Sequence, residues 1–76
     1  MKDIKIKDDF IKLDQFLKFV DVSQSGGHSK YLIKEGFVDV NGHRVDKRGK
    51  KLKPGDIVRI HIEEDHYYKT FRITEE

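Results

Sequence analysis

Six basic residues stand close together in the middle of the chain, and side chains of this kind are able to bind a polyanion. They are Arg44, Lys47, Arg48, Lys50, Lys51 and Lys53. Only two acids, Asp46 and Asp56, share their segment, so residues 41–56 carry a net charge of +4. Residues 57–76 hold three basic and five acidic residues, so the total charge of +2 conceals a basic loop and an acidic tail. Such clustering is typical of a nucleic-acid site, and a solvated charged surface is the alternative interpretation.

Four further lysines extend this pattern onto two predicted helices. Lys30 and Lys34 are four residues apart and therefore share one helix face. Lys12 and Lys18 are six residues apart, which on a helix places them about 240° from each other, so Lys18 fits a common site less well. We expect the helix lysines and the basic loop to form one concave positive surface that contacts phosphates and recognises shape more than sequence.

The remaining chemical groups give no candidate for catalysis. The chain has no Cys, no glycine-rich phosphate loop followed by Lys and Ser or Thr, and no paired carboxylates in an evident cleft. His28, His43, His61 and His66 lack the spacing and the carboxylate support of a zinc site. Of the histidines, only His28 is expected close to a bound nucleic acid. The aromatic residues Tyr67, Tyr68 and Phe71 could stack on bases, but their acidic surroundings favour packing.

Hydrophobic spacing predicts the elements that position these groups. Residues 3–7 alternate as a short strand with Ile4 and Ile6 inward, and Asp8 and Asp9 suit a turn or a helix start. A helix follows, with Leu13, Phe16, Leu17 and Val20 on one face. Ser25 is a suitable N-cap for a second helix over residues 26–35, and Gly36 is placed to end it in the left-handed conformation.

The second half of the chain changes to the period of strands. Val38 and Val40 alternate before Asn41-Gly42, a strong two-residue hairpin turn. Residues 47–53 read as a loop or irregular strand, and Pro54-Gly55 as a second turn. Residues 57–62 form the best strand, and residues 67–73 a last strand that we expect beside the first. The order predicts one α+β domain over residues 1–76, with two packed helices against a small, mostly antiparallel sheet.

Residues 12–60 carry several short motifs whose order and spacing match one family. The motifs are Lys12-Leu13-Asp14 with Leu17, Ser25, Leu32-Ile33-Lys34 with Gly36, Val38-x-Val40-Asn41-Gly42, and Pro54-Gly55-Asp56-Ile57. No motif is specific alone, but together they closely resemble the S-four-type RNA-binding domain, named after small-subunit ribosomal protein four. The leading strand and the Ser-Gly-Gly variant are similar to its stand-alone YaaA/YbcJ-type members.

The resemblance implies RNA binding, with one departure from the family pattern. Many members have Arg directly after the helix-opening Ser and Ala three residues later, where this chain has Gly26 and Ser29. Gly26 and Gly27 could instead let backbone amides at the helix start approach a phosphate. A flexible entry turn without a ligand is the equal alternative.

These observations lead to a hypothesis of function. We expect non-catalytic binding of structured ribosomal or transfer RNA, in ribosome assembly, translation or ribosome quality control, by a cytoplasmic monomer without cofactor or metal. The cytoplasmic location rests on the lack of a bilayer-spanning apolar run and of a signal-peptide pattern. A protein-interaction module that has lost RNA binding is the alternative, and a general single-strand binder is disfavoured because we expect no aromatic platform on the basic face. The expected RNA-binding residues are Lys12, Lys18, Gly26, Gly27, His28, Lys30, Lys34, Asn41, Arg44, Arg48, Lys50, Lys51 and Lys53.

Overall fold

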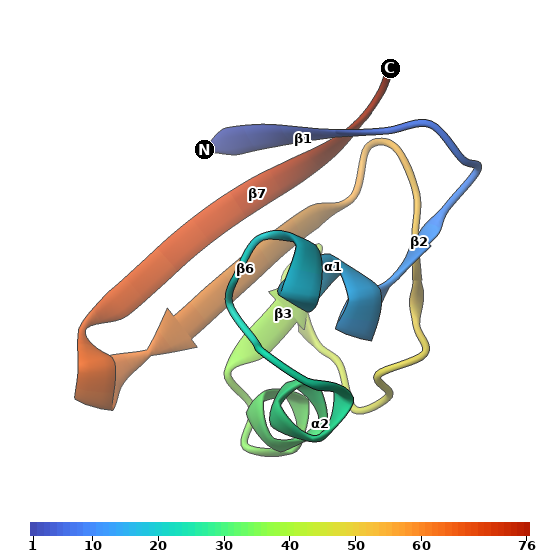
Figure 1. The fold of residues 1–76 in the computed structure, drawn as a ribbon. Helices are drawn as coiled ribbons and strands as arrows, with labels where there is room; N and C mark the ends of the chain where they lie inside the picture. The colour runs from blue at the N-terminus through green and yellow to red at the C-terminus, as the bar shows by residue number, and fades with distance from the viewer.

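The computed structural model describes residues 1–76 and has the predicted α+β architecture (Figure 1). In chain order the elements are β1 (Lys2–Ile6), β2 (Ile11–Lys12), α1 (Leu13–Phe19), α2 (Gly26–Lys34), β3 (Val38–Val40), β4 (His43–Arg44), β5 (Lys51–Leu52), β6 (Ile57–Ile62), η1 (Glu63–Asp65) and β7 (Tyr67–Glu75). Both α-helices are too short and too polar to cross a membrane.

The main sheet has five strands in the order β1-β7-β6-β3-β4. All its pairs are antiparallel except β1 with β7, which are parallel and start with Lys2 opposite Phe71. The prediction that the last strand lies beside the first is therefore confirmed. Asp3 and Arg72 face each other across this parallel pair and form an ion pair of 3.1 Å on the surface.

The helices lie on one face of the sheet, in front of β3 and β6 in Figure 1, and the core fills the space between them. Alternate residues of β6, namely Val58, Ile60 and Ile62, are buried, as the period of two predicts. Phe16 of α1 is completely buried and meets Phe71 of β7 edge to face, with ring centroids 5.5 Å apart. Ile4, Ile6, Leu13, Leu17, Leu32, Ile33 and Ile73 complete this part of the core.

A small polar contact joins the two helices where they pack together. Ser29 of α2 is fully buried, and its hydroxyl lies 2.6 Å from the hydroxyl of buried Ser23. The same Ser29 hydroxyl donates a 3.4 Å hydrogen bond to the carbonyl oxygen of Asp14 in α1. A small side chain at position 29 is therefore required for the close approach of α2 to α1, and its hydroxyl has partners.

Local signals set the ends of α2 as predicted. The hydroxyl of Ser25 accepts a 3.0 Å hydrogen bond from the backbone N–H of His28, which satisfies a first-turn amide. Gly36 follows the helix with φ of +82°, the left-handed conformation that Gly adopts without steric cost. In the next turn Asn41 and Gly42 both have positive φ and connect β3 to β4 with two residues.

The predicted start of the first helix is wrong. Lys12 was assigned with Lys18 to the first helix, but it lies in the short strand β2, with extended backbone at φ of −71° and ψ of 145°. The cause is a tertiary contact, because Ile11 and Lys12 pair with Leu52 and Lys51 of β5 as a separate two-stranded sheet. This small sheet brings the start of α1 next to the basic loop.

Candidate nucleic-acid interface

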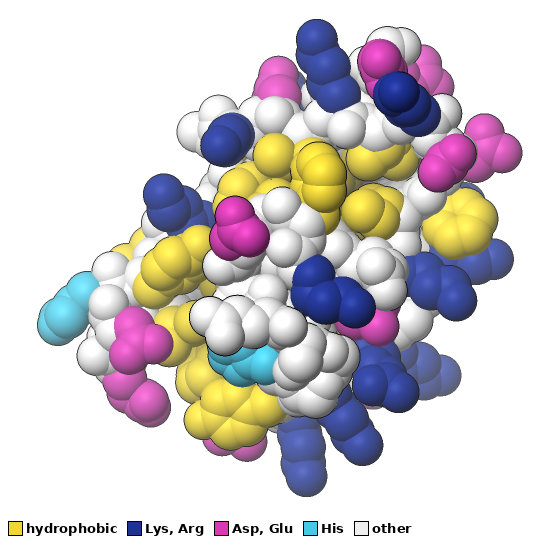
Figure 2. Space-filling model, in the orientation of Figure 1, with side chains coloured by type: hydrophobic (Ala, Val, Ile, Leu, Met, Phe, Trp, Pro, Cys, Tyr) yellow, Lys and Arg dark blue, Asp and Glu magenta, His cyan; other side chains and the backbone are white.

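The β4–β5 loop and α2 enclose a groove of about 910 Å³ whose lining is strongly basic. We call it the basic groove, and its charged lining residues are Lys30, Arg44, Asp46, Lys47, Arg48 and Lys50. None of the five cations takes part in an ion pair. Figure 2 shows Lys and Arg side chains gathered at the lower right, where α2 and this loop lie in Figure 1. The groove therefore carries uncompensated positive charge, which favours an anionic ligand.

The backbone of the basic loop is held by the first turn of α1. The N–H of Leu13 donates a 2.8 Å hydrogen bond to the carbonyl oxygen of Lys50. The N–H of Asp14 donates another, of 3.0 Å, to the carbonyl oxygen of Arg48. These two carbonyls satisfy amides that have no partner within the helix. The loop thus completes α1 and holds its own cationic side chains in a defined place.

Arg44 joins the loop side of the groove to the end of α2. Its Nη2 donates a 2.7 Å hydrogen bond to the carbonyl oxygen of Lys34, the last residue of the helix. The guanidinium also covers Gly36, where an added Cβ would lie 3.0 Å from Cζ of Arg44. A cation at a helix C-terminus is favourable because it offsets the partial negative charge there. Arg44 therefore has a structural role in addition to lining the groove.

Arg48 lies against the opposite end of α2. A methyl group added at Gly26 would be 3.6 Å from Nη1 of Arg48, an ordinary van der Waals distance. The guanidinium of the loop is thus next to the position where many family members carry an arginine of their own. Gly27 has no comparable neighbour, because an added Cβ there would meet only the hydroxyl of Ser25, at 3.9 Å.

A second group of cations lies beside the groove on the small sheet. Lys12 of β2 is directly opposite Lys51 of β5 in the antiparallel register, and both side chains are exposed. Phe10 precedes β2, and the ammonium of Lys51 sits 4.8 Å from the centroid of its ring. We call the basic groove together with Lys12 and Lys51 the basic surface. Lys34 and Lys53 are exposed at its margins, at the end of α2 and just after β5.

The structure does not bring two of the expected site residues to the basic surface. Lys18 is half-buried in the last turn of α1 and does not line the groove. His28 lines a different cavity, of about 200 Å³, which also contains the acidic residues Glu64 and Asp65. Its Nδ1 accepts a 3.3 Å hydrogen bond from the N–H of Gln24.

Asn41 borders the groove, and its exposed side chain makes two hydrogen bonds within the protein. Its Nδ2 donates a 3.0 Å hydrogen bond to Asp56, and its Oδ1 accepts a 2.9 Å hydrogen bond from the N–H of Ile57. Asp56 in turn accepts a 2.9 Å hydrogen bond from the N–H of Lys53. The amide of Asn41 therefore braces two turns, and this structural role accounts for the residue without a ligand.

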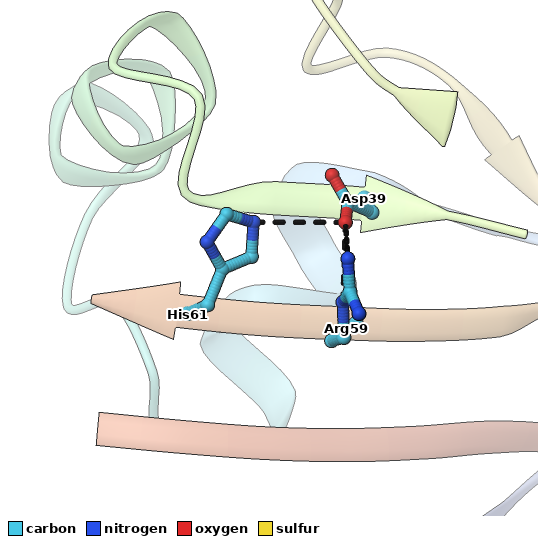
Figure 3. Close-up of polar contacts among 3 residues, drawn as sticks. All are labelled: Asp39, Arg59 and His61. Atoms are coloured by element: carbon cyan, nitrogen blue, oxygen red, sulfur yellow. Dashed lines mark hydrogen bonds and ion pairs between the residues drawn. The ribbon is translucent and has the colours of Figure 1, made fainter. Parts of the chain in front are cut away.

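The polar cluster of Asp39, Arg59 and His61 lies on the sheet face away from the helices (Figure 3). Asp39 of β3 is nearly buried, and Arg59 from β6 donates a 2.6 Å hydrogen bond to its carboxylate. The Nε2 of His61 is 3.6 Å from the same oxygen and has no hydrogen-bond partner. Burial raises the pKa of Asp39, but the hydrogen bond and charge of Arg59, together with His61, outweigh it and lower the pKa. No group of three or more His, Cys, Asp or Glu side chains in residues 1–76 could hold a metal ion.

Two residues of this surface were missed by the sequence analysis. Lys47 was counted in the basic loop but not assigned to the site, and it lines the groove. Phe10 was not considered, and it provides an aromatic ring on the basic face, where none was expected. The sequence signal that could have indicated Phe10 is its position two residues before Lys12. Of the aromatic residues that were expected to pack, Phe71 is in the core and Tyr67 packs against it, whereas Tyr68 is 59% exposed, contrary to the expectation.

A two-helix α+β domain with this connectivity, and with a basic groove between α2 and a loop anchored on α1, defines the class of the protein. The chain belongs to the S4 domain family, whose family model matches residues 4–68. It is 47% identical over 57 residues to the probable ribosome maturation protein RlbA of Bacillus subtilis (strain 168), an alignment that covers 75% of this chain and 80% of that protein. It is also 37% identical over 62 residues to an uncharacterized RNA pseudouridine synthase of Aquifex aeolicus (strain VF5), covering 82% of this chain but 20% of that protein.

Proposed function

We propose that this chain binds structured RNA through the basic surface and performs no chemistry on it. The observation that carries the proposal is the convergence of five unpaired cations, Lys30, Arg44, Lys47, Arg48 and Lys50, on one groove of about 910 Å³. These residues come from helix α2, strand β4 and the loop that follows β4. These side chains repel one another in the free protein, and a bound phosphate backbone would reduce that repulsion by neutralising their charge.

The arrangement suits recognition of RNA shape. Phosphate contacts from Lys and Arg fix the position of an RNA and carry no direct sequence information. The loop backbone is held by α1 through the carbonyls of Arg48 and Lys50, so little loop entropy is lost when RNA binds. A rigid, concave and basic surface of this kind fits the closely spaced phosphates of a paired or sharply bent RNA segment.

Arg48 and Gly26 support one specific phosphate position. The start of α2 presents first-turn amides and the positive end of the helix dipole, both of which favour an anion. The guanidinium of Arg48 adds a full charge next to Gly26. We infer that Arg48 supplies from the loop the guanidinium that many family members carry on the helix, and that a phosphate binds between the two.

The relatives suggest the biological setting. One similar protein is named as a ribosome maturation protein and is matched over most of its length, and the other is named as an RNA pseudouridine synthase and is matched over a small part. We therefore propose a cytoplasmic role on ribosomal or transfer RNA, in ribosome assembly, translation or quality control, by a non-enzymatic monomer.

A second candidate function is binding of a protein, and one observation favours it. A cavity of about 600 Å³ lies between the end of α1, β1 and β7, on a part of the surface distinct from the basic groove, and seven of its eleven lining residues are hydrophobic. Phe19 and Tyr68 at this cavity are 64% and 59% exposed. Exposed apolar groups that lie together are typical of interaction sites.

A nuclear magnetic resonance titration distinguishes the two functions. Isotope-labelled protein would be titrated with a hairpin of ribosomal RNA, and backbone amide shifts would be recorded. We expect the largest shifts at residues 26–30 and 47–51 and little change at Glu63–Asp65 in η1. An absence of shifts at physiological salt, or shifts confined to the cavity of Phe19 and Tyr68, would contradict the proposal.

A further inference from the structure

Phe10 is the one exposed aromatic residue that the structure places against a cation of the basic surface. Its side chain is 37% exposed, and the ammonium of Lys51 lies 4.8 Å from the ring centroid. The ring directly precedes β2, whose Lys12 is paired with Lys51. The aromatic ring is therefore in contact with one exposed lysine, Lys51, and lies two residues before another, Lys12.

The other exposed aromatic rings are in different surroundings. Phe19 and Tyr68 lie at the cavity between α1, β1 and β7. Tyr31 meets Phe37 edge to face at 6.3 Å and lines the cavity that contains Glu64 and Asp65. Of the exposed rings, Phe10 is the one in contact with a cation of the basic surface, so it has the phosphate-binding neighbour that a stacking site needs.

The lysine above the ring does not prevent stacking. A cation–π contact at an exposed site is worth about a 2- to 5-fold change in an equilibrium constant. A base stacked on an aromatic side chain is worth about 5- to 150-fold in binding. A base should therefore displace the Lys51 ammonium from the face of the Phe10 ring. The flexible side chain of Lys51 remains close enough to pair with the adjoining phosphate.

We propose that Phe10 stacks on an unpaired base while the basic surface holds the neighbouring paired segment. The ligand class is then an RNA stem with a bulged or looped-out nucleotide, rather than a continuous duplex. The inference rests on the proposed function and adds to it the one contact that distinguishes RNA structures of equal charge.

Two RNA hairpins with identical stems test this inference. One has a single bulged adenine and the other is fully paired, so that their phosphates differ by one. We expect the unmodified protein to bind the bulged hairpin about 5- to 100-fold more tightly. The substitution Phe10→Leu keeps the apolar bulk but removes the π face, and it should bring the ratio of the two affinities, measured with the same variant, close to one. Circular dichroism would establish that the variant is folded.

The variant Phe10→Trp gives an independent signal. The chain has no Trp, so the introduced indole is the only one. Stacking should quench its fluorescence when the bulged hairpin is added, and the paired hairpin should quench it much less. Equal affinity of the unmodified protein for the two hairpins, or an unchanged preference in Phe10→Leu, would overturn the inference and leave the proposed function standing. Binding of neither hairpin would overturn both.

Discussion

The guanidinium of Arg44 donates a 2.7 Å hydrogen bond to the carbonyl oxygen of Lys34 and thereby attaches β4 to the C-terminus of α2. The two residues were both expected to bind RNA as independent cations. Their contact instead shows that Arg44, one cation of the groove, is oriented by α2, the helix that carries Lys30 and Lys34. The position of the Arg44 charge is thus fixed by a hydrogen bond within the fold.

Removing this contact should lower stability. Arg44→Ala leaves the carbonyl of Lys34 without its partner, and we expect the free energy of unfolding to fall by about 1 kcal/mol. For a domain of this size that corresponds to a melting temperature lower by about 4–8 °C. Lys47→Ala is the matched control, because Lys47 lines the same groove without a side-chain hydrogen bond. Equal melting temperatures of the two variants would show that the Arg44 contact does not contribute.

Asn41 should matter for folding and not for binding. In Asn41→Ala the two side-chain hydrogen bonds to Asp56 and Ile57 are lost, and Ala must adopt a φ of +53°. We expect urea-induced unfolding to show a loss of about 2 kcal/mol. Asn41→Gly tolerates the same φ and should lose less.

The affinity of Asn41→Ala for RNA, measured well below its melting temperature, should equal that of the unmodified protein. A weaker affinity without a loss of stability would mean that the amide of Asn41 contacts RNA.

Asp39 should make the protein sensitive to acid. Its pKa in the folded protein is below the ordinary value of 3.8, so folding favours the ionised carboxylate. This contribution is complete above the unfolded pKa and is lost as the pH falls through the lower, folded pKa. The urea midpoint of the unmodified protein should therefore decrease more steeply below about pH 4 than that of Asp39→Asn. Asp9→Asn, at an exposed position, should follow the unmodified protein. Parallel curves for the unmodified protein and Asp39→Asn would contradict this assignment.

The elements that could be predicted from sequence are those set by local chemistry. The N-cap at Ser25, the left-handed Gly36 and the Asn41-Gly42 turn each depend on residues within a few positions, and all three occur in the structure. The alternation of β6 is long enough to show its period. The α+β class follows from the order of these elements.

The features that could not be predicted depend on contacts between distant segments. The β2–β5 sheet pairs two residues with two residues about forty positions later, which is too short for any periodic signal. In the candidate site, the clustering of charge in the sequence indicated the basic loop. Which residues lie next to that loop could be seen only in the folded structure. The guanidinium of Arg48 beside Gly26, the ring of Phe10 beneath Lys51 and the internal bonds of Asn41 are of this kind.

The salt dependence of RNA affinity tests the central claim most directly. If four to six cations of the basic surface contact phosphate, the slope of log affinity against log salt should be about −3 to −5. Arg48→Ala combined with Lys51→Ala should weaken binding and make the slope shallower by up to about 2. Lys2→Ala combined with Lys69→Ala removes the same charge at the cavity of Phe19 and Tyr68 and should leave the slope unchanged. A folded Arg48→Ala/Lys51→Ala protein with unchanged affinity and slope for ribosomal RNA would contradict the assignment of the basic surface as the RNA site.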